Sequence, residues 1–308
     1  MFLTVTMNAS IDKKCRIKTQ SIGSVNRIQS CEYSAGGKGL NVARVLKLLG
    51  ERVVCSGMLG GHAGKWIEER LDKEGIPYEF EPIAQETRSC INIIEADGRQ
   101  TEYLEPGPEI HPGELRKFET RFEALLDCVD YVIISGSTPR GVDDECYARL
   151  CSLCHKKGKY VLLDTSGIQL KRGMEAHPTL IKPNLDELKT ILGGTVDTDR
   201  LPEAAKSLQR QGIKYVVLSQ GKSGAIMACP DGVFSCRPPS VPALNATGCG
   251  DSMIAGFAYA LQRHMPPEQA LAFATAVAAA NAMEESTGFV RLDNVLRLAT
   301  MVVPNRII

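Results

Sequence analysis

The sequence has no net charge, because 36 Lys and Arg residues balance 36 Asp and Glu residues over 308 positions. Without a basic excess, the chain has no global field to attract nucleic acid or an anionic membrane, so neither is an expected partner. It also lacks internal repeats and low-complexity stretches. We therefore expect a single domain over residues 1–308 that binds small anions through local charges.

Long apolar runs are absent as well. The most apolar segment, Ala270–Met283, is interrupted by Thr275 and Asn281, and it is too short and too weakly apolar to span a bilayer. Met1–Met7 has neither the basic flank nor the apolar core of a signal peptide. These observations predict a cytoplasmic protein.

Eleven cysteines are present, an odd number scattered without a disulfide framework. Reduced, mostly buried thiols are expected. Cys151-Ser-Leu-Cys154-His155 matches the haem-attachment pattern, and a Cys-x-x-Cys pair can also serve redox or metal chemistry. No second pair stands at zinc spacing, and apolar residues recur around this one at helical spacing, so we interpret it as the buried face of a helix.

Short apolar strands alternate with helical patterns from residue 108 onward, as in Tyr131–Ser135, Tyr160–Asp164 and Tyr215–Ser219. This rhythm is typical of a parallel sheet with helices on both faces, which predicts an α/β fold. A hairpin around Asp97-Gly98 has polar and apolar residues mixed on both arms, as in a sheet with one wet face. We expect a small β appendage from about residues 12–34 and 86–107.

The stretch Leu244–Leu261 joins a Gly-rich turn to a helix. Gly248, Cys249 and Gly250 place backbone amides at a helix N-terminus, which suits an anion such as phosphate. Asp251 has two interpretations there: it caps the helix, or it takes a proton from a hydroxyl that attacks a phosphoryl group. This stretch alone does not separate them. The same position is expected to lower the pKa of the Cys249 thiol.

Two segments resemble nucleotide-binding motifs but lack a glycine at the required spacing. Gly221-Lys222-Ser223 resembles the end of a P-loop, but Val216 stands where its first glycine belongs. Gly248-x-Gly250 has Met253 in place of the third glycine of a dinucleotide fingerprint. A dinucleotide-dependent dehydrogenase is therefore disfavoured.

Other polar residues lie in loops after the strands, where α/β sheets bind ligands. Asp12 either accepts hydrogen bonds from a sugar or belongs to an ordinary turn. Lys38 lies at a helix start, in a glycine turn that also suits a solvated lysine. Arg27 and Arg88 would bind a phosphate if one pocket gathered them, and are otherwise surface residues.

Asn184 and Glu187 stand three residues apart at a helix start. This spacing suits Mg²⁺ held through water, and it equally suits a local helix cap.

Ala35–Arg44 resembles the N-terminal signature of the ribokinase-like, PfkB-type carbohydrate kinases, and Asn245–Ser252 resembles their C-terminal signature. Met7–Asp12, Ser135–Gly141 and Lys182–Leu188 also match, so the resemblance covers essentially the whole chain. It implies a Rossmann-like core covered by helices on both faces, a β lid, the use of ATP and Mg²⁺, and a homodimer that forms through the lids.

The resemblance also implies roles for individual residues. Asp251 would be the catalytic base, with Gly248, Cys249 and Gly250 as the anion hole. The residues expected to hold the sugar phosphate are Asp12, Arg27, Gly37, Lys38, Asn41, Arg88 and Ser137. Those expected to hold ATP and Mg²⁺ are Lys182, Asn184, Glu187, Ser219, Gly221, Gly224 and Asn281, with Asn281 near the adenine and Asn184 and Glu187 holding the metal through water.

Within the family, Val25–Arg27, Glu86–Cys90 and Gln100–Ile110 are most similar to tagatose-6-phosphate kinases. This implies phosphorylation of tagatose 6-phosphate to a 1,6-bisphosphate, with fructose 1-phosphate as the alternative substrate, as in the related 1-phosphofructokinases. Three positions depart from the family pattern: Cys249 replaces a small Ala or Ser, Ser10 stands near a common Pro or Ala, and Gln220 replaces an apolar residue after Ser219. A catalytically weak sugar-phosphate binder is the alternative from a different class.

Overall fold

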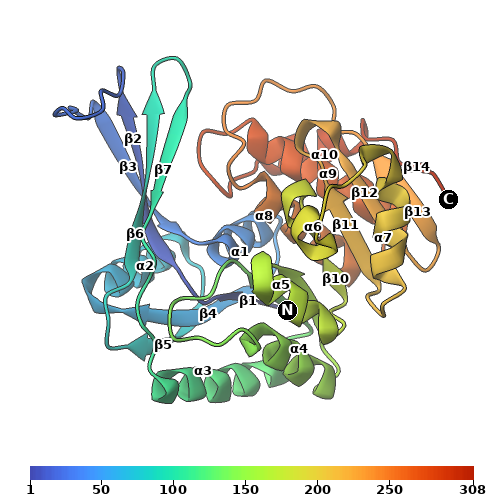
Figure 1. Cartoon of the computed structure of the whole chain (residues 1–308), viewed down its shortest axis with the longest axis horizontal. Coiled ribbons are helices and arrows are strands. Elements are labelled where there is room, and N and C mark those ends of the chain that lie inside the picture. Colours follow the sequence, from blue (N-terminus) through green and yellow to red (C-terminus); the bar gives the residue numbers. More distant parts are fainter.

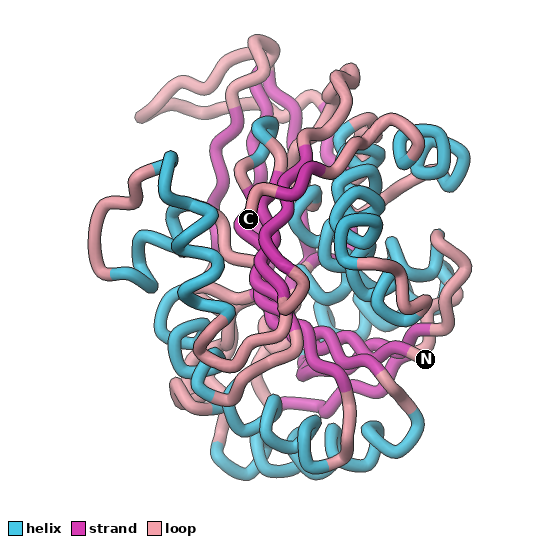
Figure 2. The backbone as a smooth tube through the Cα atoms, turned by 90° about the vertical axis from the view of Figure 1, so that its right-hand side faces the viewer, coloured by secondary structure: helices cyan, strands magenta, loops and turns pink.

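A ten-stranded sheet forms the centre of the computed structural model, which describes residues 1–308 (Figures 1 and 2). The strand order is β14-β13-β12-β11-β10-β9-β8-β1-β4-β5. Neighbours from β11 to β5 are parallel, and β12 to β14 continue one edge antiparallel. The bounds are β1 (Phe2–Thr6), β4 (Val53–Gly60), β5 (Tyr78–Ile83), β8 (Tyr131–Ser135), β9 (Tyr160–Asp164), β10 (Leu180–Ile181), β11 (Tyr215–Ser219), β12 (Ala225–Cys229), β13 (Gly232–Cys236) and β14 (Asn305–Arg306).

Helices cover both faces of this sheet, because successive strand residues point into opposite layers. In β1, Phe2 belongs to one buried core and Leu3 to the other. The first core packs against α1 (Lys38–Leu48), α2 (Gly61–Glu74), α8 (Cys249–Gln262), α9 (Pro267–Ala282) and α10 (Leu292–Ala299). The second packs against α3 (Pro112–Leu125), α4 (Cys146–Lys156), α5 (Gly167–Glu175), α6 (Leu185–Leu192) and α7 (Leu201–Gln209). The predicted α/β fold is confirmed.

A second sheet, called the small sheet below, has the strand order β3-β2-β6-β7. It projects from the body at the upper left of Figure 1 and consists of β2 (Ser10–Ile17), β3 (Ser30–Gly36), β6 (Arg88–Glu95) and β7 (Gln100–Leu104). Gly98 has φ +88°, which suits the tight turn between β6 and β7. The face with Lys14 and Arg16 is turned toward the body, since both side chains contact Glu285.

The elements β5 and α5 were not predicted. β5 contains a proline and alternates glutamates with apolar residues at the sheet edge, and α5 contains two glycines. Both form because the neighbouring sheet and helices supply their partners. Short 3₁₀ turns at Leu126–Cys128, Thr198–Arg200 and Gly221–Ser223 complete the chain.

The Cys-x-x-Cys segment lies on α4, where Cys146, Cys151 and Cys154 are all buried. Burial raises the pKa of Cys154 to about 12. The structure contains no group of three or more His, Cys, Asp or Glu side chains placed to hold a metal. The helix-face interpretation is therefore confirmed. No helix is long and apolar enough to cross a membrane.

Close packing of α8 against α9 gives a stability prediction at Gly256. A Cβ atom there would lie 2.7 Å from the Ala274 Cα, so Gly256→Ala should overpack this contact. Overpacking costs about 1–3 kcal/mol and should outweigh the gain in helix propensity of about 1 kcal/mol. We expect a lower free energy of unfolding by urea denaturation.

Gly113 is the matched control, because it is also helical but a Cβ there would meet only the Arg116 guanidinium, at 4.0 Å. Gly113→Ala should be neutral or slightly stabilising. Equal effects of the two substitutions would contradict the packing argument.

Candidate active site

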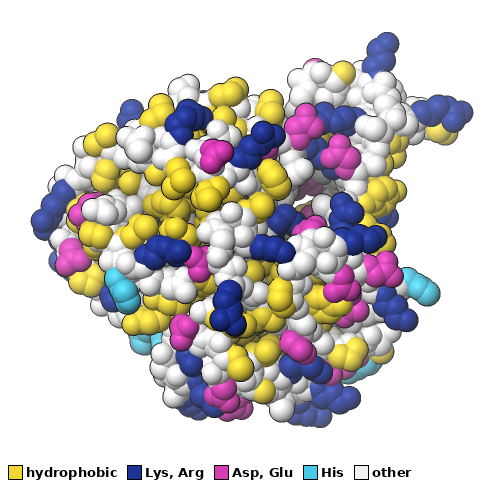
Figure 3. Space-filling view, turned by 180° about the vertical axis from the view of Figure 1, so that it is seen from behind, with side chains coloured by type: hydrophobic (Ala, Val, Ile, Leu, Met, Phe, Trp, Pro, Cys, Tyr) yellow, Lys and Arg dark blue, Asp and Glu magenta, His cyan; other side chains and the backbone are white.

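A polar cleft of about 1040 Å³ lies between the small sheet and the carboxyl ends of the central parallel strands. In Figure 3 it is visible as the recess below the small sheet, at upper right, with charged side chains at its rim. The predicted residues that line it are Asp12, Gly37, Lys38, Asn41, Arg88, Ser137, Lys182, Asn184, Glu187, Ser219, Gly248, Gly250 and Asp251. The structure thus gathers most of the predicted site from segments far apart in the sequence.

Asp251 lies in the first turn of α8 with only 6% of its surface exposed. Asn41 Nδ2 donates a hydrogen bond to Asp251 Oδ2 at 2.8 Å. Burial raises the pKa of Asp251 to about 6, although the Lys38 charge and the Asn41 hydrogen bond oppose the rise. The N-cap position belongs to Gly248, with no side-chain cap, so Asp251 does not cap the helix. The structure therefore favours the general-base interpretation.

Two lysines lie beside a second buried carboxylate, that of Asp164 at the end of β9. Lys182 Nζ lies 3.2 Å from Asp164 Oδ1, and Lys38 Nζ lies 3.7 Å from Asp164 Oδ2. The Asp164 charge raises the pKa of Lys38, so this lysine stays cationic. Neither oxygen of Asp164 has a hydrogen bond of good geometry. Asp164 thus keeps two cations beside Asp251, where a phosphoryl group would need them.

Arg44 of α1 fixes the orientation of the Asn41 amide. Its Nη1 donates to Asn41 Oδ1 at 3.1 Å, which leaves the Asn41 amide nitrogen to face Asp251. The same guanidinium donates to the Ala35 carbonyl at 3.0 Å and to Glu74 Oε2 at 2.9 Å. Arg44 therefore connects the root of the small sheet, α2 and the buried carboxylate.

The start of α8 offers backbone N–H donors, but the three predicted amides differ in whether their N–H is free. Gly248 has φ +82°, and a Cβ atom there would lie 2.7 Å from Thr287 Cγ2. The Cys249 N–H already donates to the Ala246 carbonyl at 3.3 Å, whereas the N–H groups of Gly250 and Asp251 have no backbone acceptor. Among the three predicted amides, only that of Cys249 is engaged, since the Gly248 N–H has no acceptor either. Lys182 Nζ would be 3.3 Å from a Cβ on Gly250.

The prediction for the Cys249 thiol is wrong. Burial raises its pKa, and the Asp251 charge contributes to the rise, while a hydrogen bond from Asn281 opposes it. Loss of solvation therefore outweighs the helix dipole at this position.

Asn281 does not fit its predicted place near adenine. It is fully buried, and its Oδ1 accepts hydrogen bonds from Ser252 Oγ and from the N–H groups of Gly288 and Phe289. Its Nδ2 donates to the Thr247 carbonyl at 3.0 Å. Both ends of the amide are engaged, so Asn281 has no group left to bind the adenine base. It instead holds the turn before α8 against the 283–289 loop.

At the other end of the cleft, Asp12 and Arg88 lie on the small sheet. Burial raises the pKa of Asp12, whose Oδ1 accepts a 2.6 Å hydrogen bond from Ser10. Arg88 donates to the carbonyls of Asn8 and Glu105 and forms no ion pair, so its charge is available to an anion. Ser137 Oγ lies 3.3 Å from Asn8 Nδ2. Gly37, with φ +118°, precedes α1 beside Lys38.

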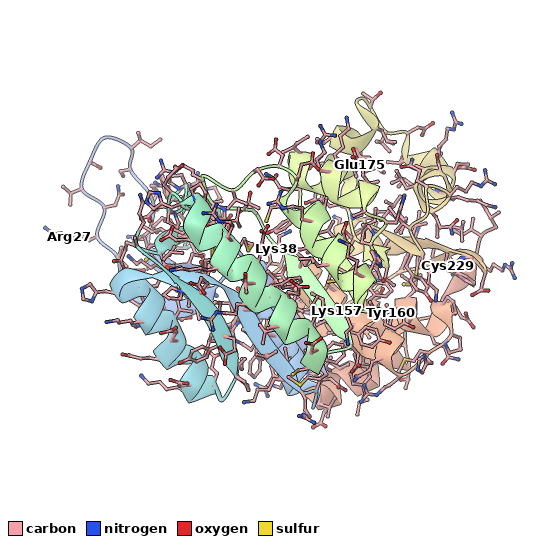
Figure 4. The ribbon with its side chains drawn as sticks, turned by 90° about the horizontal axis from the view of Figure 1, so that it is seen from below. Arg27, Lys38, Lys157, Tyr160, Glu175 and Cys229 are labelled. Atoms are coloured by element: carbon pink, nitrogen blue, oxygen red, sulfur yellow. The ribbon has the colours of Figure 1, made fainter.

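Arg27 is not brought to this cleft. It is exposed on the loop between β2 and β3, and Figure 4 shows it at the far end of that loop, away from Lys38. Within one copy of the chain, Arg27 and Arg88 do not share a pocket.

Asn184 and Glu187 form a capping box at the start of α6. Asn184 Oδ1 accepts the N–H groups of Asp186 and Glu187, and Glu187 Oε2 accepts the Asn184 N–H at 2.8 Å. Glu187 Oε1 is outside the cap. Ser219 ends β11 at the cleft, while Gly221 and Gly224 lie in the following turn with φ +56° and +99° and do not line it.

Unpartnered polar atoms mark the cleft as a binding site for a polar ligand. Buried side-chain atoms without a hydrogen bond belong to Thr6, Asn8, Arg88, Asn92, Ser135, Asp164 and Gln262. All of these except Asp164 and Gln262 line the cleft, and Asp164 contacts two lysines that do. Since buried polar groups are normally paired, this concentration points to a ligand that supplies their partners.

Sequence reasoning missed Asp164 and Arg44. Asp164 ends a buried strand and is followed by Thr165-Ser166-Gly167, a signal comparable to the loops that were singled out. Arg44 looks like an ordinary helix residue, and nothing in the chain around it indicates that it reaches Asn41, Ala35 and Glu74 at once.

Comparison with known proteins agrees with this geometry. A family model described as pfkB family carbohydrate kinase matches residues 5–294. Phosphofructokinase-2 from Escherichia coli, solved in complex with potassium, is 26% identical, with a TM-score of 0.91 over 97% of this chain and 98% of that one. Other structures of that enzyme are described as a complex with fructose-6-phosphate and as a tetrameric inhibited form.

Two proteins of Thermotoga maritima are also similar. One, described as a possible 1-phosphofructokinase, is 28% identical, with a TM-score of 0.91 over 100% of this chain and 99% of that one. The other, a ribokinase, is 20% identical, with a TM-score of 0.79 over 97% of this chain and 99% of that one. This similarity shows that the chain has the ribokinase-like fold.

The raised pKa of Asp251 predicts that Asp251→Asn stabilises the protein at neutral pH. The pKa is 3.8 in an unperturbed chain and about 6 in the fold, so ionised Asp251 destabilises the folded state above pH 6. Two pKa units correspond to about 3 kcal/mol, the upper value expected for the gain.

The destabilisation decreases as pH falls from 6 and disappears below 3.8, where both states are protonated. We therefore expect urea unfolding to show a gain at pH 8 and only about half of it at pH 5. A gain independent of pH would contradict the assigned cause.

Arg44→Gln should raise the pKa of Asp251 further, because the freed Asn41 amide can turn away from the carboxylate. Loss of one hydrogen bond to a charged group is worth about 1.5–3 kcal/mol, or about one to two pKa units. A carboxyl ¹³C titration by NMR measures this shift. Arg70→Gln is the matched control, since Arg70 also pairs with Glu74, at 3.7 Å, but does not bond Asn41. Equal shifts in both variants would refute the positioning role of Arg44.

Proposed function

This chain belongs to the pfkB family of carbohydrate kinases, and we propose that it transfers a phosphoryl group from Mg-ATP to a primary hydroxyl of a ketohexose monophosphate. The observation that carries this proposal is the buried Asp251, with its pKa of about 6, beside free helix amides and two lysines. A base, a set of anion-stabilising donors and fixed cations are the groups that phosphoryl transfer requires.

In the proposed reaction, Asp251 accepts the proton of the attacking hydroxyl. Such a base typically contributes about 10²–10⁴-fold to the rate. The N–H groups of Gly250 and Asp251, with the positive end of the α8 dipole, would stabilise the negative charge on the transferring group. Lys182 lies beside the same amides and would contact the phosphates, and Lys38 would hold the sugar hydroxyl and support the same charge.

The nucleotide would lie along the ends of β10 and β11, near Lys182 and Ser219, with Gly221 and Gly224 shaping the turn beyond. For Mg²⁺, the capping box leaves Glu187 Oε1 as the free carboxylate oxygen, whereas Asn184 Oδ1 already accepts two N–H groups. Glu187 therefore fits a metal held through water better than Asn184 does. Bound Mg²⁺ would neutralise charge on the ATP phosphates.

The sugar phosphate would extend from Asp251 toward the small sheet. Asp12, Gly37 and Asn41 would hold its hydroxyls, and Arg88, which has no ion pair, would bind its phosphate. We propose tagatose 6-phosphate as the substrate, with fructose 1-phosphate as the alternative. The two 6-phosphates of tagatose and fructose differ at a single hydroxyl centre, so one or two hydrogen bonds decide between them.

We further propose that the small sheet is a lid, part of one kinase domain over residues 1–308, and that two copies pair through it. The face opposite the one that carries Lys14 exposes two tyrosines: Tyr33 and Tyr103 are 50% and 51% exposed. The adjoining loop exposes Ile22 and Val25 by 98% and 85%. Pairing would cover this apolar surface and would bring Arg27, remote from its own cleft, toward that of the second copy.

A catalytically weak sugar-phosphate binder with the same fold remains the alternative from another class. A protein that only binds a sugar phosphate would gain nothing from a buried carboxylate that destabilises the fold. We therefore prefer the enzyme. A cytoplasmic location, where ATP is available, stays part of the proposal.

The decisive experiment compares kcat/KM for tagatose 6-phosphate, fructose 6-phosphate and fructose 1-phosphate in a coupled ADP assay. Tagatose 6-phosphate should give the highest value. Asp251→Asn should lower kcat at least 10²-fold with little change in KM, because the base acts only in the transition state.

A variant that keeps more than about a tenth of the wild-type kcat would remove Asp251 from its role, since even a weak general base contributes more than this. No turnover by the wild type on any of the three sugars, with sugar phosphate still bound in calorimetry, would favour the binder.

A further inference from the structure

Two cysteines of the small sheet face each other across neighbouring strands. Cys15 of β2 and Cys31 of β3 are directly paired in the antiparallel register, and their sulfur atoms lie 2.7 Å apart. Directly opposed residues have Cα atoms about 4.5–5.5 Å apart, and a disulfide spans about 4.4–6.8 Å. The pair therefore needs no backbone rearrangement to be bridged.

This arrangement sets the pair apart from the other cysteines. All eleven are free thiols, and no other two have their sulfur atoms in contact. The three cysteines of α4 are fully buried in the helix–sheet core, and no sulfur–sulfur contact joins them. Only the small sheet therefore offers two thiols already placed for a bond.

The two thiols differ in access, which gives the reaction an order. Cys31 is half-buried, whereas Cys15 is only 2% exposed. Burial and the neighbouring Cys31 thiol raise the pKa of Cys15 to about 11. Cys31 is thus the sulfur that a reagent in solution reaches first, and Cys15 is placed to react second.

We propose that Cys15 and Cys31 form a reversible disulfide when the protein meets a low-molecular-weight disulfide such as oxidised glutathione. The Cys31 thiolate attacks one sulfur of the reagent, forms a mixed disulfide and releases one glutathione. Cys15 then gives up its proton and attacks Cys31 Sγ, which forms the Cys15–Cys31 bond and releases the second glutathione. The two protein thiols lose two hydrogens and two electrons, and the reagent is reduced to two thiols.

The bond would join β2 to β3 on the face away from the cleft. Successive residues of a strand point to opposite faces, so Lys14, which contacts the body, lies on the other side from Cys15. The bond would close the loop that carries Arg27 without displacing the side chains over the cleft. The modification does not depend on the proposed kinase reaction, and its test requires no activity assay.

The test exposes the full-length protein, in dilute solution, to oxidised glutathione and then maps the thiols by mass spectrometry. We expect a Cys15–Cys31 cross-linked peptide and no glutathione retained on either residue. Brief trypsin treatment gives a second readout, because Lys18 and Arg27 lie in the exposed loop between the two cysteines. Nicked, oxidised protein should migrate as one chain in SDS without reductant and as two fragments with it.

Cys128 is the internal control, because it is the one exposed cysteine and should take up glutathione. Cys31→Ser should abolish the cross-link, Cys15→Ala should leave glutathione on Cys31, and Cys128→Ser should leave the cross-link intact. Thermal unfolding of the reduced variants checks that they are folded. A stable glutathione adduct on wild-type Cys31, or unreacted Cys15 and Cys31 while Cys128 reacts, would overturn the proposal.

Discussion

Burial of a carboxylate at the start of α8 is the constraint on which the site depends. Asp251 is removed from water at a cost, and the chain offsets this cost only in part, with one hydrogen bond from Asn41 and the charges of Lys38 and Lys182. If these contacts fully offset the cost of burial, the pKa of Asp251 would be lower and its carboxylate would be a weaker base. The incomplete balance, set by groups from α1 and from the end of β10, leaves a pKa of about 6, which suits the proposed role as a base near neutral pH.

The geometry around this carboxylate is held by contacts that bring no charge of their own to the reaction. Gly248 lets the 283–289 loop approach the helix start, and Asn281 ties that loop to the turn through both ends of its amide. On the opposite side, Arg44 fixes the orientation of the Asn41 amide. Gly248, Asn281 and Arg44 therefore position the groups that would act on a ligand, as expected for a preorganised centre.

The small sheet serves two environments because its residues alternate between faces. One face carries Asp12, Lys14 and Arg88 over the cleft and toward the body. The other carries Cys15, Cys31, Tyr33 and Tyr103, and the two tyrosines are half exposed. A strand period of two thus separates the proposed sugar contacts from the surface proposed for pairing and for the thiol bond.

The sequence by itself determined the α/β class, the position of the helix that begins near Gly248, and the placement of polar loop residues at the strand ends. These depend on local periodicity, on glycine turns and on the rule that parallel strands end at one edge. Only the tertiary structure decided between the alternatives that remained open. It gave the N-cap to Gly248 rather than Asp251, engaged Asn184 and Glu187 in a cap, buried Asn281 and partly buried Cys249. It also placed Arg27 outside its own cleft. Residue spacing leaves such alternatives open for two physical reasons. The Asn184 and Glu187 spacing suits a cap and a metal equally, and only the surrounding structure selects between them. Solvation and contacts between distant segments decide the rest, as in the pairing of Asn41 with Asp251 across 210 residues.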